Sequence, residues 1–240
     1  MIYKQGCRGE AVKRIQKIIG CFPDGIYGKL TTEAVKAWQR AHSLKPIDGI
    51  VGPATLAAME KVQSTTTSSQ PALGKDGITM TCKGGTIRLK RSKRTINEII
   101  VHCTADPEGR DKTVEQIRAN HMAPVSKGGR GWSDIGYHYI IYRDGTIHEG
   151  RNVDISGAHC TNHNARSIGV VYVGGLENKP GVAYKDLKPK DTRTEAQKDS
   201  LIALLESLRL LYPEAKIYGH RNFANKACPS FDAKTEYKNI

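Results

Sequence analysis

No stretch of this 240-residue sequence approaches the roughly 20 consecutive apolar residues that a membrane-spanning helix needs. The first ten residues contain no apolar core of the kind found in secretory signals. The six cysteines lack the close, even spacing of a disulfide framework, and the one pair to consider is Cys7 with Cys21. These absences predict a protein without a transmembrane segment that is made and folded in a reducing cytoplasm, with one or two domains at this length.

Acidic residues are scarce in the first part of the chain. Residues 1–62 carry 10 Lys+Arg against 5 Asp+Glu, residues 63–95 carry 7 against 1, and residues 96–240 carry 20 against 18. A basic front end favours an anionic partner, which can be nucleic acid, a membrane or a bacterial envelope. The basic run that ends at Arg94 has no interleaved aromatic residues and no known reading motif, so we expect no specific nucleic-acid binding.

Residues 1–62 contain an internal repeat, in which Asp24–Gly28 recurs as Asp48–Gly52. Each copy has an Asp-Gly turn, then an aliphatic residue, and then a threonine expected to cap a helix, Thr31 or Thr32 in the first copy and Thr55 in the second. Apolar residues recur with a helical period at Val12, Ile15, Ile18 and Ile19, and again at Ala34, Val35, Trp38 and Ala41. The pattern predicts a small all-α domain of three helices.

Residues 63–77 are small and polar, as is typical of a flexible linker. Apolar residues in 78–81 and 86–90 flank a Gly-Gly pair, which predicts a β-hairpin. The predicted organisation is therefore a first domain over 1–62, a linker over 63–77 and a second domain over 78–240.

From Ile96 onward, strand-like and helix-like patterns alternate. Strands are expected at 96–102, 137–142, 146–148, 167–173 and 216–218. Thr113 with Gln116 predicts a capping box for a helix with Val114, Ile117 and Met122 turned inward. Thr194 is expected to begin a second helix, with one apolar face made of Leu201, Leu204, Leu205, Leu208 and Leu211. The fold class is therefore α/β, a mixed sheet flanked by helices.

Two histidines stand at the ends of strand-like runs. His102 closes Ile96–His102, whose consecutive aliphatic residues indicate a buried central strand, and His220 follows 216–218. Lys226 and Cys228 lie within the next eight positions. Ligands tend to bind at the carboxyl ends of strands, and imidazole and thiolate are zinc ligands. A His and a Cys eight residues apart are nevertheless more often structural when nothing else accompanies them.

Five segments supply that further context: 100–105, 134–146, 164–170, 173–175 and 220–232. In this order they resemble the zinc-dependent N-acetylmuramoyl-L-alanine amidases of the phage lysozyme type, which share a fold with the peptidoglycan recognition proteins. The resemblance spans roughly residues 96–235. It implies a zinc ion held by His102, His220 and Cys228.

Three protein ligands with one open position are typical of catalytic zinc, which lowers the pKa of a bound water to about 7. Cys103 is a tempting fourth ligand and would make the site structural. Neighbouring residues of a strand point to opposite faces, however, so we expect Cys103 in the core.

The resemblance implies roles for four further residues. Tyr137 matches the catalytic tyrosine of the family, and Lys226 matches a lysine that stabilises the developing oxyanion. His159 and Asn164 are implied to lie along the substrate groove. Without the family, Tyr137 would be taken for a core aromatic residue and Lys226 for a solvent-facing lysine. The carboxylate base that many relatives carry after the Ile-Gly pair is missing here, since 168–173 reads Ile-Gly-Val-Val-Tyr-Val, so the general base stays unassigned.

The first domain resembles the bacterial peptidoglycan-binding module over Gly9–Gln16, Asp24–Gly28, Ala34–Gln39 and Asp48–Thr55. Trp38 is expected to be a core residue. The resemblance implies that this domain binds glycan or stem peptide.

Together these features predict a modular amidase that cuts between N-acetylmuramic acid and L-alanine in peptidoglycan. A phage or prophage endolysin is expected, a monomer that reaches the wall after the membrane is permeabilised, with the tethered module raising its concentration there. Three alternatives stay open. A non-catalytic peptidoglycan receptor on the same fold would be expected to lack a zinc ligand. The others are a nucleic-acid-binding protein and a wall hydrolase that cuts another bond.

Overall fold

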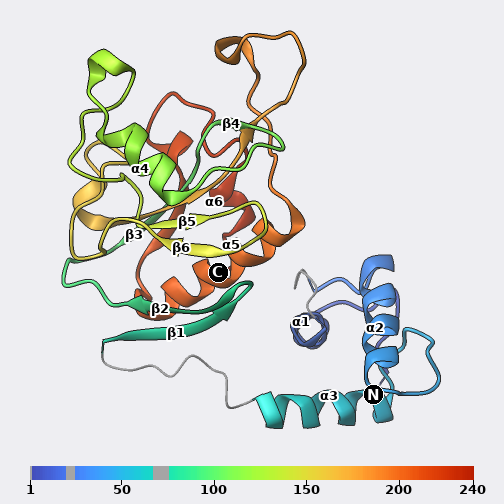
Figure 1. Ribbon diagram of the computed structural model, residues 1–240. Coiled ribbons are helices and arrows are strands. Elements are labelled where there is room, and N and C mark those ends of the chain that lie inside the picture. The colour runs from blue at the N-terminus through green and yellow to red at the C-terminus, as the bar shows by residue number, and fades with distance from the viewer. Residues whose placement is uncertain (1, 20–24, 67–75) are drawn as a thin grey trace. The chain divides into compact units, whose positions relative to one another are not determined.

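The computed structural model describes residues 2–19, 25–66 and 76–240. The chain divides into two compact units, Met1–Gln70 and Pro71–Ile240 (Figure 1). The first unit contains α1 (Glu10–Ile18), α2 (Lys29–Ala41) and α3 (Pro53–Thr66). The second contains β1 (Gly77–Cys82), β2 (Gly85–Lys90), β3 (Glu98–Cys103), β4 (Asp106–Pro107), α4 (Val114–Met122), β5 (Tyr139–Ile141), β6 (Ile147–Glu149), β7 (Ser167–Tyr172), β8 (Gly175–Leu176), α5 (Glu195–Leu211), β9 (Lys216–Gly219) and α6 (Ala233–Glu236).

Two buried glutamines organise the repeat of the first unit. Gln16 accepts from the backbone N–H of Gly25 and donates to the carbonyl of Ile26. Gln39 makes the same pair of bonds with Gly49 and with the residue that follows it. Each glutamine thus ties a helix to the Gly-Ile pair of one repeat, and the internal repeat predicted from the sequence is a repeat of this bonding pattern.

The threonine caps predicted for this unit are wrong. Helix α2 begins at Lys29 with Gly28 as its N-cap, and α3 begins at Pro53, so Thr31 and Thr55 lie inside helices. Both threonine hydroxyls instead contact the buried glutamine side chains. The expectation for Trp38 holds, since it is buried in the core of this unit.

The predicted linker overlaps described structure at both ends. Helix α3 continues to Thr66, and strand β1 begins at Gly77. Residues 67–75 lie outside the described residues, as do Asp24 of the first turn and Cys21, the partner considered for Cys7.

The second unit is built on a five-stranded mixed sheet in the order β6-β5-β7-β3-β9. Strands β5, β7, β3 and β9 run parallel to one another, and β6 pairs antiparallel with β5. This confirms the predicted mixed sheet. The register pairs Val101 of β3 with Gly219 of β9, so the residues that follow, His102 and His220, emerge at the same level.

Helices cover both faces of the sheet (Figure 1). On one face, alternate residues of the strands pack against α5, whose five predicted leucines are all fully buried. On the other face, Ile140 and Val171 pack with Val114 and Ile117 of α4. Because side chains alternate along β3, Cys103 joins the α5 core whereas His102 turns to the α4 face, as expected from the sequence.

The capping box predicted at Thr113 with Gln116 is present, and α5 begins after Thr194 as predicted, where the structure shows a second capping box with Gln197. One inward residue was predicted wrongly: Met122 is 47% exposed. It is the last residue of α4, and His121 fills the inward position beside it.

The β1–β2 hairpin packs its apolar residues Ile78, Met80 and Leu89 into the α5 core. Arg94, at the end of the basic run that follows, donates to the carbonyls of Val153 and Ser167 among others and is half-buried. At Arg94, the basic run therefore contributes hydrogen bonds that hold two segments of the second unit together.

Candidate metal centre

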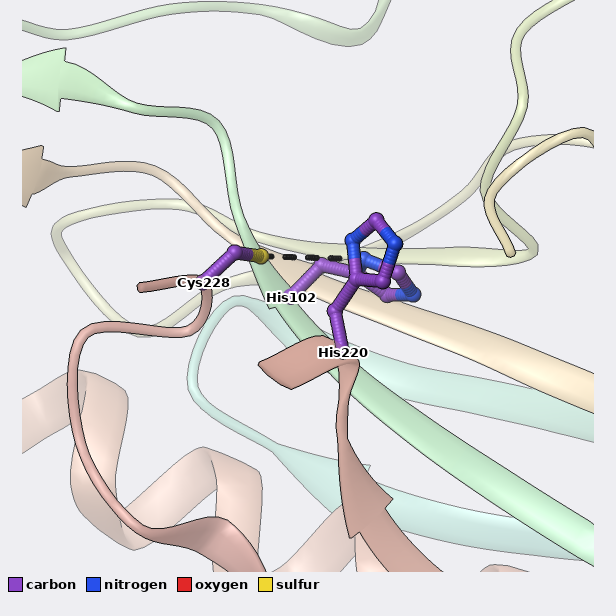
Figure 2. Close-up of side chains that lie close together, drawn as sticks. All are labelled: His102, His220 and Cys228. Carbon is purple, nitrogen blue, oxygen red and sulfur yellow. Dashed lines mark hydrogen bonds between the residues drawn. The ribbon is translucent and has the colours of Figure 1, made fainter. Parts of the chain in front are cut away.

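Three side chains from separate segments meet at the carboxyl end of β3 (Figure 2). His102 is the fifth residue of that strand, His220 begins a single 3₁₀ turn after β9, and Cys228 follows on the next loop. One ligand atom from each residue lies within 4.8 Å of the others, and the Sγ atom of Cys228 is 3.7 Å from Nδ1 of His102. The three residues implied by the family resemblance are thus brought together.

This donor set fits a zinc ion. With Zn–S near 2.3 Å and Zn–N near 2.05 Å, two tetrahedral ligand atoms are separated by about 3.6 Å. The 3.7 Å between Cys228 and His102 matches that separation. Two imidazoles and a thiolate supply three ligands, which is the number typical of a catalytic site with one open position.

The three residues that follow Cys228 are anchored to other parts of the second unit. The Tyr172 hydroxyl donates to the carbonyl of Pro229, and the Ser230 hydroxyl donates to that of Gly175. Beyond them, the guanidinium of Arg193 lies 3.3 Å from the centre of the Phe231 ring. These contacts fix the thiol relative to the sheet before any metal binds.

Both histidines are neutral at neutral pH, as metal ligands must be. Burial, followed by the neighbouring His159 and His220 rings, lowers the pKa of His102 well below its ordinary value. Burial and then the charge of Lys226 lower the pKa of His220 to about 4. The hydrogen bond with Cys228 lowers the pKa of the Cys103 thiol to about 7, although a bound metal ion would place the thiolate on Cys228 instead.

Tyr137 lies beside this cluster, just before β5, with its ring centre 5.2 Å from that of His102. Burial raises the pKa of its hydroxyl above the ordinary value, so the group keeps its proton and is a hydrogen-bond donor at neutral pH. Lys226 is exposed on the loop between His220 and Cys228, and its charge acts on both of them.

His159 and Asn164, predicted to lie along the substrate groove, make contacts inside the protein. The His159 ring is only 7% exposed, and its Nδ1 lies 3.0 Å from Nε2 of His102. The Asn164 side-chain oxygen accepts from the backbone N–H groups of His159 and Cys160. The contacts described for both side chains are thus within the protein, close to the ring of the candidate ligand His102.

A cavity of about 610 Å³ adjoins Tyr137 on the α4 side. Its lining is polar and includes Arg110, Lys112 and Arg130. Lys112 is paired with the buried carboxylate of Asp106. Among the described residues, the guanidinium groups of Arg110 and Arg130 have no hydrogen-bond or ion-pair partner, so both are available to a bound anion.

A comparison with known protein families identifies the family of this chain. The N-acetylmuramoyl-L-alanine amidase model matches residues 92–231, more than half of the chain, and includes all three candidate ligands. The chain belongs to the N-acetylmuramoyl-L-alanine amidase family. A peptidoglycan binding domain model matches residues 8–59, within the three-helix unit.

Relatives of this amidase include endolysins. The endolysin of Klebsiella phage KP32 is 39% identical over 142 residues, which are 59% of this chain and 85% of the relative. The endolysin of Escherichia phage T7 is 38% identical over 144 residues, 60% of this chain and 87% of the relative. A solved amidase, LysC of Clostridium intestinale, is 30% identical with a TM-score of 0.46, and the match covers 60% of this chain and 83% of that one. No helix in the described part of this chain has the length and apolar character needed to cross a membrane.

The sequence did not single out several residues that lie close to the candidate site. Nothing in it places Arg110 and Arg130 beside Tyr137 in the lining of one cavity. Ser167, at the start of β7, was assigned only as part of a strand, yet its hydroxyl reaches the His159 ring. The one signal for this role in the sequence is that Ser167 is a polar residue at the start of an otherwise apolar strand.

Proposed function

We propose that this protein is a zinc-dependent amidase that hydrolyses the bond between N-acetylmuramic acid and L-alanine in peptidoglycan, acting on the wall as a phage endolysin. The observation that carries the proposal is the meeting of His102, His220 and Cys228 beside Tyr137 in a chain of the amidase family. When bound, zinc supplies an activated water and polarises the carbonyl that is attacked.

The protein's own residues supply the remaining parts of the reaction. Tyr137, protonated at neutral pH, donates a hydrogen bond to the oxygen on which negative charge develops. The ammonium of Lys226, on the loop between His220 and Cys228, stabilises this negative charge as well. Neither group needs to lose its proton for this role, which agrees with the absence of a carboxylate after Gly169.

We place the peptide part of the substrate in the cavity next to Tyr137. Stem peptides carry carboxylates, and the lining of this cavity offers the guanidinium groups of Arg110 and Arg130, neither of which is paired with another described residue. The three-helix unit would bind the wall polymer and hold the amidase near it.

The test is the release of alanine amino groups from purified peptidoglycan, with reducing sugar ends followed in parallel. Amines that appear without new reducing ends, vanish with a zinc chelator and return with added zinc support the proposal. Reducing ends in place of amines would indicate a glycosidase. Tight wall binding with bound zinc and no amine release would indicate a receptor, the alternative from another class.

A further inference from the structure

A chain of hydrogen bonds leads from the His102 ring to a main-chain carbonyl. Nε2 of His102 lies 3.0 Å from Nδ1 of His159, and Nε2 of His159 lies 3.3 Å from the hydroxyl oxygen of Ser167. That hydroxyl donates to the carbonyl of His163 at 2.8 Å. This series of hydrogen bonds lies inside the protein, since His102, His159 and Ser167 are all buried.

The carbonyl at the end of this series decides which atom is the donor and which is the acceptor in each of its hydrogen bonds. A carbonyl can only accept a hydrogen bond, so the Ser167 hydroxyl donates to the carbonyl of His163. The same hydroxyl must then accept a hydrogen bond from Nε2 of His159. A neutral His159 that carries its proton on Nε2 has a bare Nδ1. Nε2 of His102 must then donate to it, which leaves Nδ1 of His102 unprotonated and facing Cys228 at 3.7 Å.

The His159 ring packs closely against the backbone of two glycines, whose missing side chains leave room for it. A Cβ atom on Gly157 would lie 2.4 Å from Cδ2 of His159, and a Cβ atom on Gly169 would lie 2.5 Å from the same atom. No other residue type fits at either position without moving the ring. The backbone of His159 is held as well, by the side chain of Asn164.

We propose that His159, oriented by Ser167, is a positioning residue that fixes the tautomer and orientation of His102 and so presents Nδ1 to the metal ion. The inference rests on the proposed zinc site. Partners that hold the far nitrogen of a metal-bound imidazole typically contribute a 10- to 100-fold gain in metal affinity. Substrate does not touch His159 in this role.

A matched pair of substitutions tests the hydrogen bond separately from packing. Asparagine places its amide oxygen near the position of histidine Nδ1, whereas glutamine places its terminal group near Nε2. His159→Asn therefore keeps an acceptor for His102, and His159→Gln loses it. We expect the full-length His159→Gln protein to bind Zn²⁺ at least about 10-fold more weakly than wild type, with His159→Asn within about 3-fold.

Affinity would be measured by competition with a chromophoric chelator, and the Co²⁺-substituted proteins would report coordination through their visible spectra. Urea unfolding of the metal-free variants shows whether each one is folded. Ser167→Ala provides a second, smaller perturbation, for which we expect a several-fold loss of affinity that does not require His159 to change.

Three outcomes would overturn the inference. Equal zinc affinity and identical Co²⁺ spectra in wild type and His159→Gln would show that the bond does not position His102. Equal losses in His159→Asn and His159→Gln would show that ring packing, and not the acceptor, matters. A wild-type protein that binds no zinc would overturn the proposed zinc dependence itself, whereas in the first two cases that proposal stands.

Discussion

Removing the hydroxyl of Tyr137 should separate catalysis from stability. Tyr137→Phe keeps the ring and its contact with His102, at 5.2 Å between ring centres. Among the described residues the hydroxyl has no hydrogen-bond partner, and the side chain lines the cavity. Its loss should therefore change the free energy of unfolding by no more than about 0.5 kcal/mol.

The effect on the reaction should be much larger. One donor to a developing oxyanion contributes about 3 kcal/mol to transition-state stabilisation, so kcat should fall on the order of 10²-fold. The remaining donor, Lys226, should keep activity measurable. Because the pKa of Tyr137 is raised, its titration should not shape the pH profile below pH ~10.

The assay is amine release from purified peptidoglycan, with zinc content and thermal unfolding measured on the same samples. Tyr139→Phe is the control, since Tyr139 is 1% exposed and lies in the core on the other face of the sheet. The reasoning is refuted if Tyr137→Phe keeps activity within about threefold of wild type. It is also refuted if the variant loses zinc, because the hydroxyl would then act on the metal site.

Three further predictions concern the cavity, a buried histidine and the core. Arg110→Ala with Arg130→Ala should raise KM for peptidoglycan fragments with little change in kcat, and an unchanged KM for fragments with free carboxylates would contradict the placement of the peptide. Burial lowers the pKa of His138 to about 4, so the unfolded state binds more protons between pH 4 and pH 6.5. The free energy of unfolding of the metal-free protein should fall across that interval as pH decreases, with His138 contributing about 3 kcal/mol, and urea titrations of His138→Gln should show a shallower fall. Leu208→Ala, at a position with 0% exposure, should cost about 2–5 kcal/mol in urea unfolding, whereas Leu210→Ala, at 48% exposure, should stay within about 0.5 kcal/mol.

Local signals in the sequence predicted most of the second unit. The capping box at Thr113, the helix start at Thr194 and the leucine face of α5 are present as expected, because each depends on residues within a few helical turns. The caps expected at Thr31 and Thr55 are wrong, and the contacts of these two residues are not local. Their hydroxyls accept hydrogen bonds from glutamines of the preceding helix, 15 and 16 positions earlier in the sequence.

The candidate metal centre also has features that the sequence predicted and features that it did not. Sequence order and residue type were enough to select His102, His220 and Cys228, because the resemblance places them in matching segments. The surroundings of His159 were not readable from the sequence. Its bond to His102 joins residues 57 positions apart, and it forms only once β3 and β7 pair and two glycines leave room for the ring.

The sequence by itself therefore predicted the fold class and the two-part organisation, since these follow from periodicity and composition, and its family resemblance predicted the three candidate metal ligands. The tertiary structure decided which neighbours those side chains have. Partners of a buried polar group depend on strand register and on the space left by residues far along the chain, and neither can be obtained from local sequence. That is why Tyr137 acquired its cavity, and His102 its hydrogen-bond chain, only in the folded protein.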